Sequence, residues 1–479
     1  MKRLASLLES NGPVAPARLE SPDPRRDQIS LMPADIAAEY NSILEAEPNL
    51  VEQSRDYLLD RFRQVKFVFG GRTLSPYLRP HFISRVEWKS ITTACETVWG
   101  AIDKVGRAAQ ANAEMLDDLG LTEAELRLAT IDPGYEEVSV TSRLDSFLEG
   151  DRYSFVELNA ECPAGIAYAD VAAEIFLDMP VMRRFAANHK IAPMYCRQLL
   201  LDSLLEIYAR VRGRGEKPNI GIVDYRGLPT QREFELFKDY FERAGYGATI
   251  ADPRDLELRQ GKLYNGDFRI DLLYRRVLVT EFLEKIDECK AMVEAYGTQA
   301  VVVVNSFRTK YVHKKMLFGI LTDDRYAAHF SQTEQAAIRS HVPWTRKLRE
   351  VPTNYHDQKV DLIEFVRQNQ ERLVMKPNDD YGGHGIYIGW ELNQNAWENA
   401  IHKALNGDYL VQERVATGRE VFPFINESEG GTVQMVEQLL DVDPLLFFGR
   451  VGGAFTRLSS SSLANVSSGG GMVPTLLAD

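Results

Sequence analysis

SRLDSFLEGDRYSFVELNAECPAG, residues 142–165, contains two short strand-like runs separated by the turn signal EGDR. Side chains at positions i and i+2 of an extended strand point to the same face, so Arg143 and Asp145 share a face, as do Glu157 and Asn159. A hairpin through the turn would bring both pairs together. Carboxylate and amide oxygens are ligands that Mg²⁺ prefers, although an ordinary solvated hairpin carries similar charges.

A second stretch, KPNDDYGGHGI at residues 376–386, follows an apolar run and contains three glycines. Lys376 ends the predicted strand, where its ammonium could reach a phosphate. Gly382, Gly383 and Gly385 would let backbone N–H groups approach phosphate oxygens. The loop lacks the Gly-Lys-Ser/Thr ending of a Walker A motif. A glycine-rich hairpin turn is the alternative interpretation.

The composition excludes several classes of protein. The chain has 479 residues, 44% of them hydrophobic, which is enough for two or three packed modules. A net charge of −13 argues against a general nucleic-acid binder. The four scattered cysteines form no CxxC pair, so we expect neither a zinc knuckle nor a disulfide scaffold. Without a signal-peptide pattern or a membrane-length apolar run, the sequence predicts a cytoplasmic protein with no membrane partner.

The periodicity of the sequence divides the chain into five regions. Residues 1–30, rich in Pro, Arg and Asp, are predicted to form a mobile arm. Residues 31–135 are mainly helical in pattern, and 136–194 carry the predicted hairpin. Strands alternate with helices in 195–305, which is typical of a parallel α/β unit. Residues 306–479 begin with a predicted helix from Lys310, in the run KYVHKKMLFGILTDD, and then mix strands with glycine turns.

Polar residues follow two of the predicted strands in the α/β unit. Asp224 and Tyr225 come after the first strand, and Arg275 and Arg276 follow the run DLLY. An arginine pair at this place could hold the carboxylate of a substrate. Ordinary charges at the ends of strands are the alternative.

Taken in chain order, these segments resemble the ATP-grasp superfamily in a circularly permuted arrangement. RLD and ELN precede KPNDDYGGHG and VQERV, an order shared with eukaryotic glutathione synthetase and glutathionylspermidine synthetase. VELNAECPAGIAYAD (156–170) is similar to the Glu-x-Asn-Ala-(Asp/Glu)-x-Pro segment of these proteins, and NVSSGGGMVP (465–474) to their Asn…Gly-Gly segment. The resemblance implies an α+β fold whose two subdomains clasp ATP, with a Rossmann-like α/β pre-grasp domain and an N-terminal helical region.

The resemblance also implies a role for individual residues. The implied Mg²⁺ ligands are Asp145, Glu157 and Asn159. The implied residues at the transferring phosphate or acyl end are Arg143, Arg457 and Asn465. The implied ATP-binding residues are Lys315, Lys376, Gly382, Gly383, Gly385, Gln412, Glu413, Val415 and Glu420. Among them, Gln412 to Val415 would form the adenine hinge, and Glu413 and Glu420 would be its hinge and ribose carboxylates. Lys314 is the rival of Lys315 for the second nucleotide lysine.

The function implied by the resemblance is an ATP- and Mg²⁺-dependent ligase. It would join a small-molecule or peptide carboxylate to an amine through an acyl phosphate, with positioning and charge stabilisation as the work of the protein. A regulatory or scaffold protein that only binds ATP, and a phosphotransferase, remain alternatives. The chain shows no amidase-like module, and its glycine loop differs from those of glutathione synthetases, which leaves the substrates open. We also allow for a homodimer, which no sequence feature establishes.

Overall fold

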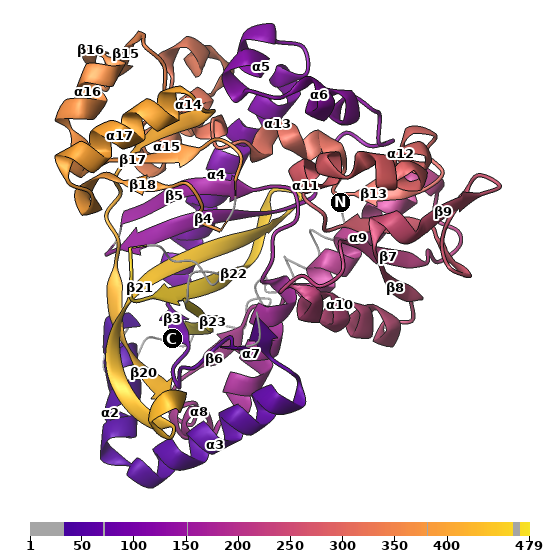
Figure 1. Ribbon diagram of the computed structural model, residues 1–479. Coiled ribbons are helices and arrows are strands. Elements are labelled where there is room, and N and C mark those ends of the chain that lie inside the picture. The colour runs from indigo at the N-terminus through magenta and orange to yellow at the C-terminus, as the bar shows by residue number, and fades with distance from the viewer. Residues whose placement is uncertain (1–32, 70–71, 151, 381, 463–469) are drawn as a thin grey trace, which may run out of the picture.

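The computed structural model describes residues 33–69, 72–150, 152–380, 382–462 and 470–479. Within these residues the largest sheet has the strand order β3-β23-β22-β21-β4-β5, with β20 added beside β21 and β6 beside β23 (Figure 1). Its strands are β3 (His81–Ile83), β4 (Thr141–Glu149), β5 (Arg152–Asn159), β6 (Ile191–Pro193), β20 (Arg419–Asn426), β21 (Thr432–Phe447), β22 (Arg450–Ser459) and β23 (Gly471–Ala478). Strands from the two ends of the chain therefore share one sheet.

The predicted hairpin is present as β4 and β5. The two strands are antiparallel, with Arg143 opposite Asn159 and Asp145 opposite Glu157. The register shifts directly after Asp145, so the two polar pairs lie just before a β-bulge. The pairing confirms the hairpin predicted from the spacing of the polar residues.

A second sheet has the order β14-β19-β17-β18 and is antiparallel throughout. Its strands are β14 (Thr345–Lys347), β17 (Leu373–Pro377), β18 (Tyr387–Ile388) and β19 (Tyr409–Glu413). The helices α16 (Leu362–Gln368) and α17 (Gln394–Leu405) pack on it through a core that includes Trp397 and Val366. The hairpin of β15 (Pro352–Tyr355) and β16 (Gln358–Asp361) lies beside α16 (Figure 1).

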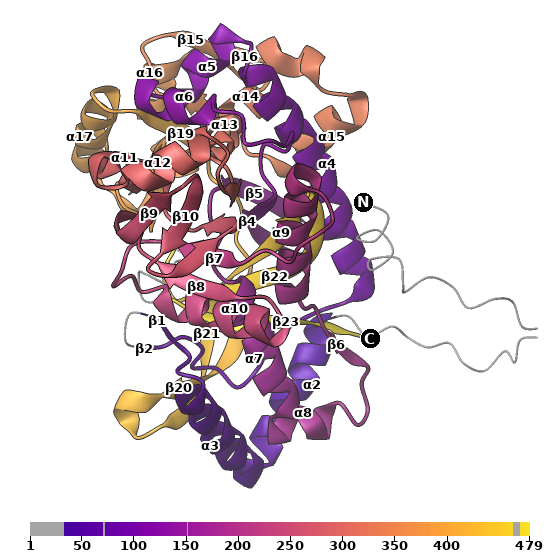
Figure 2. The ribbon, with the colours of Figure 1, turned by 90° about the vertical axis from the view of Figure 1, so that its right-hand side faces the viewer.

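The third sheet is the predicted parallel α/β unit, with the order β13-β12-β7-β8. Its strands are β7 (Ile220–Val223), β8 (Ala248–Ala251), β12 (Leu272–Arg275) and β13 (Val302–Val304). The helices of this unit are α9 (Arg197–Arg212), α10 (Gln231–Arg243), α11 (Val279–Glu284) and α12 (Lys290–Gly297). A meander of β9 (Leu256–Arg259), β10 (Lys262–Asn265) and β11 (Phe268–Ile270) projects beyond it (Figure 2).

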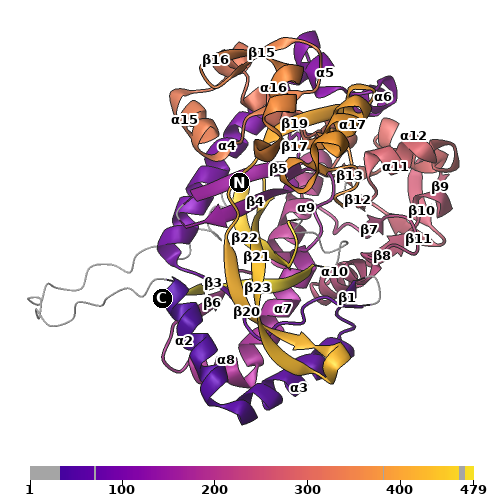
Figure 3. The ribbon, with the colours of Figure 1, turned by 60° about the vertical axis from the view of Figure 1, so that its left-hand side comes forward.

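Further helices enclose the large sheet. α4 (Arg85–Ala109) begins with a capping box between Ser84 and Glu87, and its buried face includes Val98, Ile102 and Val105. The other helices are α2 (Pro33–Ala46), α3 (Pro48–Gln64), α5 (Ala113–Leu119), α6 (Glu123–Ala129), α7 (Ile166–Asp178), α8 (Pro180–Phe185), α13 (Lys310–His313), α14 (Leu317–Leu321) and α15 (Gln332–His341). Figure 3 shows α2, α3 and α8 at the lower end of the molecule, next to the β20–β21 hairpin.

The structure departs from the sequence predictions in two places. Short strands β1 (Val68–Phe69) and β2 (Arg72–Thr73), together with β3, interrupt the region predicted to be helical. The helix expected from Lys310 onward breaks between α13 and α14 because Asn378 binds the backbone at the break. Its carbonyl accepts from Lys315 N at 2.9 Å, and its side-chain oxygen accepts from Met316 N at 2.9 Å.

Candidate active site

All three sheets contribute to a single cavity of about 610 Å³. Most of the site residues predicted from the sequence line this cavity, although some are separated by about 300 positions in the chain. The predicted site residues that line it are Arg143, Asp145, Glu157, Asn159, Arg276, Lys315, Lys376, Gly382, Gly383, Gln412, Glu413, Val415 and Arg457. The hairpin carboxylates and the lysine of the glycine loop therefore face the same space, as a permuted chain order requires.

Two arginines hold the carboxylate of Asp145. Arg143 donates two hydrogen bonds to it, at 2.8 Å and 2.9 Å, and Arg457 Nη2 donates a third at 2.6 Å. Asn159 Nδ2 adds a fourth at 2.8 Å. Burial alone would raise the pKa of Asp145, but the two guanidinium groups and the hydrogen bonds hold it well below its usual range.

Sequence reasoning missed two further carboxylates at this place, Asp441 and Asp443 on β21. Arg457 on the neighbouring strand lies 2.6 Å from Asp441 Oδ2 and 3.0 Å from Asp443 Oδ2. Burial raises the pKa of Asp441 and raises that of Asp443 well above its ordinary value, although Arg457 opposes both shifts. Within the described residues, Asp443 Oδ2 is buried without a hydrogen-bond partner. The cluster thus contains three carboxylates, Asp145, Asp441 and Asp443, but only two arginines among the described residues.

The phosphate-binding candidates line the same cavity. Lys376, on β17, is 9% exposed, and its Nζ donates to Gln412 Oε1 at 2.8 Å. Burial lowers the pKa of Lys376 to about 8, although Glu157 acts in the opposite direction. Lys315 Nζ lies 3.6 Å from Glu157 Oε2 and donates to the carbonyl of Asp380, at the start of the glycine loop. Both ammonium groups are therefore held close to the predicted metal ligands.

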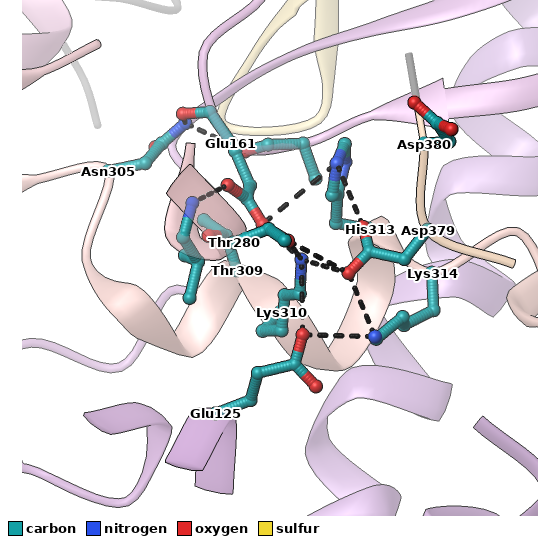
Figure 4. A network of polar contacts seen from close by, with 12 residues as sticks. Glu125, Glu161, Thr280, Asn305, Thr309, Lys310, His313, Lys314, Asp379 and Asp380 are labelled. Carbon is teal, nitrogen blue, oxygen red and sulfur yellow. Dashed lines mark hydrogen bonds and ion pairs between the residues drawn. The ribbon is translucent and has the colours of Figure 1, made fainter. Parts of the chain in front are cut away.

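The structure distinguishes Lys315 from its rival Lys314. Lys314 does not line the cavity but points into a buried ionic network behind it, where its Nζ is 2.9 Å from Glu125 and 2.8 Å from Asp379 (Figure 4). In the same network Lys310 contacts Glu125, Asp379 and Glu161 at 3.4 Å, 2.7 Å and 3.1 Å. The break between α13 and α14 thus sends consecutive lysines to opposite sides, and Lys315 is the one available to a ligand.

The strand β19 ends at the predicted adenine hinge. Gln412 is buried, while Glu413 accepts a hydrogen bond from Tyr355 Oη at 2.5 Å. Val415 lines the cavity in the segment that leaves the strand. An irregular segment after a strand has backbone N–H and C=O groups that can pair with the edge of a base.

The glycines of the predicted phosphate loop have left-handed backbone conformations. The φ angles of Gly382, Gly383 and Gly385 are +74°, +78° and +67°, a region in which other residues are strained. Gly382 and Gly383 line the cavity. Gly385 lies instead against Pro377 and Tyr409, each of which would be 2.8 Å from an added Cβ. Two glycines of the loop therefore face the cavity in which a ligand would bind, and the third allows close packing against Pro377 and Tyr409.

Two predicted residues lie elsewhere, and a third is not described. Glu420 does not line the cavity; at the start of β20 it binds the buried Arg79 at 2.9 Å. Arg275 is fully buried, and it donates to the carbonyl oxygens of Asn305 and Val277 at 2.8 Å and 2.6 Å rather than facing the cavity. Asn465 falls outside the described residues. The expected ribose and substrate roles of Glu420 and Arg275 thus do not match their positions.

The residues fit a nucleotide with a hard divalent cation. The side chains of Asp145, Glu157, Asn159 and Asp441 supply oxygen donors of the type that Mg²⁺ prefers, and within the same cluster three carboxylates share two arginines. Among the described residues, no three His, Cys, Asp or Glu side chains are already arranged as a metal-binding group. The arginines occupy the carboxylates in this structure, so a cation would compete with them.

Comparison with solved structures supports the fold. A glutathione synthetase-like effector from Globodera pallida, in its apo form, is 13% identical, with a TM-score of 0.56 over 90% of this chain and 97% of that one. A putative γ-glutamylcysteine synthetase from Methylobacillus flagellatus KT aligns over 80% of this chain and 85% of its own length, with 11% identity and a TM-score of 0.40. At such identities the first likeness concerns the fold alone.

Comparison with sequences gives a more specific result. No curated protein matches the chain. Among the described helices, none is both long and apolar enough to cross a membrane. The family model of a circularly permuted ATP-grasp domain matches residues 143–412, more than half of the chain, from the first arginine of the hairpin to the strand before the hinge. The chain belongs to the circularly permuted ATP-grasp family.

Proposed function

We propose that the protein is an ATP- and Mg²⁺-dependent ligase that joins a carboxylate to an amine and releases ADP and phosphate. The observation that carries the proposal is the single cavity in which the carboxylates of β4, β5 and β21 face Lys315 and Lys376. A site for phosphoryl transfer needs positive groups on the phosphates and oxygen ligands for the metal. Both kinds of group are present, and the family membership agrees with them.

The residues divide into two sides around the transferring group. Lys376 and Lys315, with the backbone of Gly382 and Gly383, are placed to bind phosphates, and the segment after Gln412 to bind adenine. Asp145, Glu157, Asn159 and Asp441 would hold Mg²⁺, which when bound would neutralise phosphate charge. Arg143 and Arg457 are placed to meet the negative charge that develops as a substrate carboxylate becomes an acyl phosphate. The amine then displaces phosphate from the acyl group.

Cysteine chemistry is not part of this proposal. Cys162 lines the cavity, but burial raises the pKa of its thiol to about 12. A thiol with such a pKa stays protonated at neutral pH and is a poor nucleophile. The reaction proposed here depends on positioning and charge stabilisation by the arginines, lysines and carboxylates.

The test uses hydroxylamine as a substitute for the unknown amine. The protein is incubated with MgATP, hydroxylamine and pools of amino acids and small carboxylic acids, and hydroxamate, ADP and phosphate are measured. Hydroxamate with equimolar ADP is the expected result, and the reactive pool identifies the acid. Lys376→Met is the matched inactive variant, and the exposed Lys403→Met is the control that should behave as the wild type.

Other outcomes would replace the proposal. AMP and pyrophosphate would indicate adenylation and contradict an acyl phosphate. A phosphorylated product that never reacts with hydroxylamine would indicate a phosphotransferase. Binding of MgATP without turnover in any pool would favour a regulatory or scaffold protein of the same fold.

A further inference from the structure

The cavity has a second end, formed by the parallel α/β unit. Asp224 directly follows β7 and Arg276 directly follows β12, and these strands are neighbours with Val223 opposite Arg275. From β7 the chain crosses first to β8 on one side and later to β12 on the other, so its carboxyl end is a topological switch point. Ligands of open parallel sheets bind in the crevice at such a point. Both Asp224 and Arg276 line the cavity there.

Both terminal nitrogens of the Arg276 guanidinium are bound within the protein, and only its buried Nε has no hydrogen-bond partner among the described residues. Its Nη1 donates to the carbonyl of Pro163 at 2.8 Å and to Tyr274 Oη at 3.0 Å. Its Nη2 is 3.3 Å from the fully buried carboxylate of Glu233, and its guanidinium lies over three aromatic rings, of Phe234, Phe237 and Tyr274. Arg276 is therefore a weak attractor for the carboxylate of a substrate, contrary to the expectation from the sequence.

Asp224 is in the opposite situation. It is 7% exposed, and among the described residues the only hydrogen bond that its side chain receives comes from the N–H of Tyr225, at 2.8 Å. Glu281 also lines this end of the cavity. Among the described residues the carboxylate of Asp224 has no ion pair within 4 Å, and it is bordered by the apolar side chains of Leu228 and Leu278. A ligand with a positive charge and an apolar part fits these surroundings.

We propose that Asp224 binds the amine substrate of the ligase as a protonated primary amine and accepts its proton before the amine attacks. This inference rests on the proposed function for the reaction, although the cation-binding site can be tested without it. The amine, R–NH₃⁺, gives one proton to the Asp224 carboxylate. The resulting R–NH₂ forms the new C–N bond, the bond from the acyl carbon to the phosphate oxygen breaks, and the second proton leaves with phosphate.

One short segment connects the amine end with the reacting end. Arg276 binds the carbonyl of Pro163, and Arg143 Nη1 binds the carbonyl of the next residue, Ala164, at 2.9 Å. Adjacent carbonyls of one chain lie a few ångströms apart. The arginine that faces the acyl phosphate and the sheet edge that carries Asp224 are therefore held against the same turn, as transfer between the two ends requires.

The protonation of Asp224 suits this role. Burial raises its pKa to about 7, while the hydrogen bond from Tyr225 and the charges of Arg276 and Arg275 lower it and that of Glu281 raises it. Cys162, which also lies near it, keeps a neutral thiol because burial raises its pKa to about 12. A carboxyl group with a pKa near the working pH can both accept and release a proton. A bound ammonium group would favour the charged form.

Binding is tested with three four-carbon probes, n-butylamine, 1-butanol and butyrate, titrated into the full chain at pH 7.5 and followed by saturation-transfer NMR. Wild type is expected to bind butylammonium at least tenfold more tightly than butanol and to reject butyrate. Asp224→Asn, which keeps the shape and the acceptor for Tyr225, should lose this preference, while the exposed Asp239→Asn on α10 should keep it. No butylammonium binding by wild type, or an unchanged preference in Asp224→Asn, would overturn the inference.

The reaction separates this inference from the proposed function. Hydroxylamine is largely uncharged at neutral pH and needs no proton acceptor, so Asp224→Asn should form hydroxamate within about twofold of the wild-type rate. With n-butylamine as acceptor, kcat/KM of Asp224→Asn should fall by about 10²-fold relative to wild type. The rate of this reaction should rise through pH 7 in the wild type and not in the variant. Equal losses with both acceptors would contradict the role of Asp224. Butylammonium binding without any hydroxamate would instead contradict the ligase and leave the cation site standing.

Discussion

The buried network around Lys310 and the cluster around Arg457 are both built from opposite charges, yet two carboxylates of the first titrate below their usual range and two of the second titrate above it. Although burial acts to raise both pKa values, nearby positive groups, Lys310 and His313 first among them, lower that of Glu161 to about 2 and hold that of Asp379 far below its usual range (Figure 4). Burial raises the pKa values of Asp441 and Asp443 instead, although Arg457 acts in the opposite direction, whereas the pKa of Asp145 in the same cluster stays low because two guanidinium groups bind it.

The difference shows which cluster serves the fold and which serves a ligand. The Lys310 network matches each carboxylate with ammonium groups and is closed to the cavity except at its edge. The Arg457 cluster lies at the cavity, which Asp145, Asp441 and Arg457 line, and it keeps two buried carboxyl groups whose pKa values are raised. Carboxylates with raised pKa values in a cavity are typical of functional sites. The predictions below follow from this contrast.

The largest expected effect is on the reaction. Asp145→Asn keeps the shape of the side chain but removes the charge shared by Arg143 and Arg457. We expect ADP-forming turnover of the folded protein to fall by about 10²–10³-fold, because these groups stabilise the charge that develops in the transition state. Steady-state kinetics with the acid identified by the hydroxamate assay measures the loss. Turnover within twofold of wild type would remove Asp145 from the site.

In the closed network the largest effect is on stability. Glu161→Gln leaves Lys310 without one of its partners in a buried place, and we expect the free energy of unfolding to fall by about 3–5 kcal/mol. Urea unfolding measures the change, with Glu364→Gln, which breaks an exposed pair with Arg367, as the control at below about 1 kcal/mol. If both variants lost the same small amount, the network would not be structural.

The consecutive residues Lys314 and Lys315 provide a further test of the contrast between the buried network and the cavity. Lys315→Met should weaken ATP binding by about 2 kcal/mol, roughly 30-fold, because it removes a positive group from the phosphates, and should leave stability nearly unchanged. Lys314→Met should do the reverse, lowering the free energy of unfolding while the folded protein keeps its affinity for ATP. Calorimetric titration with the nucleotide and urea unfolding provide the two readouts. An exchange of the two results would assign the nucleotide to Lys314.

The smallest effect concerns pH. The pKa of Asp224 is about 7 in the folded protein, above its value in the unfolded chain, so this group makes the wild type less stable as pH rises from about 4 to 7. Asp224→Asn removes that dependence, and we expect it to stabilise the empty protein by about 1 kcal/mol at pH 8 and not at pH 4.5. Thermal unfolding at both pH values measures it. Destabilisation at pH 8 would show that the charge of Asp224 supports the fold.

The local pattern of the sequence was enough to predict the hairpin and the parallel unit. The register of Asp145 against Glu157 follows from alternation and one turn, and the strands of the α/β unit are continuous apolar runs. Asp441 and Asp443 were missed because the sequence Asp-Val-Asp-Pro is typical of a turn, whereas the structure continues one strand through Pro444. Two acids at i and i+2 beside apolar runs, with Arg457 on the next strand, were the available signal.

The remaining differences depend on contacts between distant segments. Asn378 breaks the helix that would otherwise begin at Lys310, and this break decides which of two adjacent lysines faces the cavity. Arg79 binds Glu420 from a position 341 residues earlier in the chain. Neither contact leaves a periodic trace in the sequence around the residue concerned, so propensity and spacing could not predict them.

The central claim is that one cavity holds both the nucleotide and its metal ion between the hairpin and the glycine loop. Anomalous diffraction from crystals grown with Mn²⁺ and a non-hydrolysable ATP analogue tests it most directly. We predict a manganese peak within coordinating distance of Asp145, Glu157 or Asp441, with the adenine against the segment after Gln412. An analogue bound elsewhere, or a metal peak away from these carboxylates, would contradict the account.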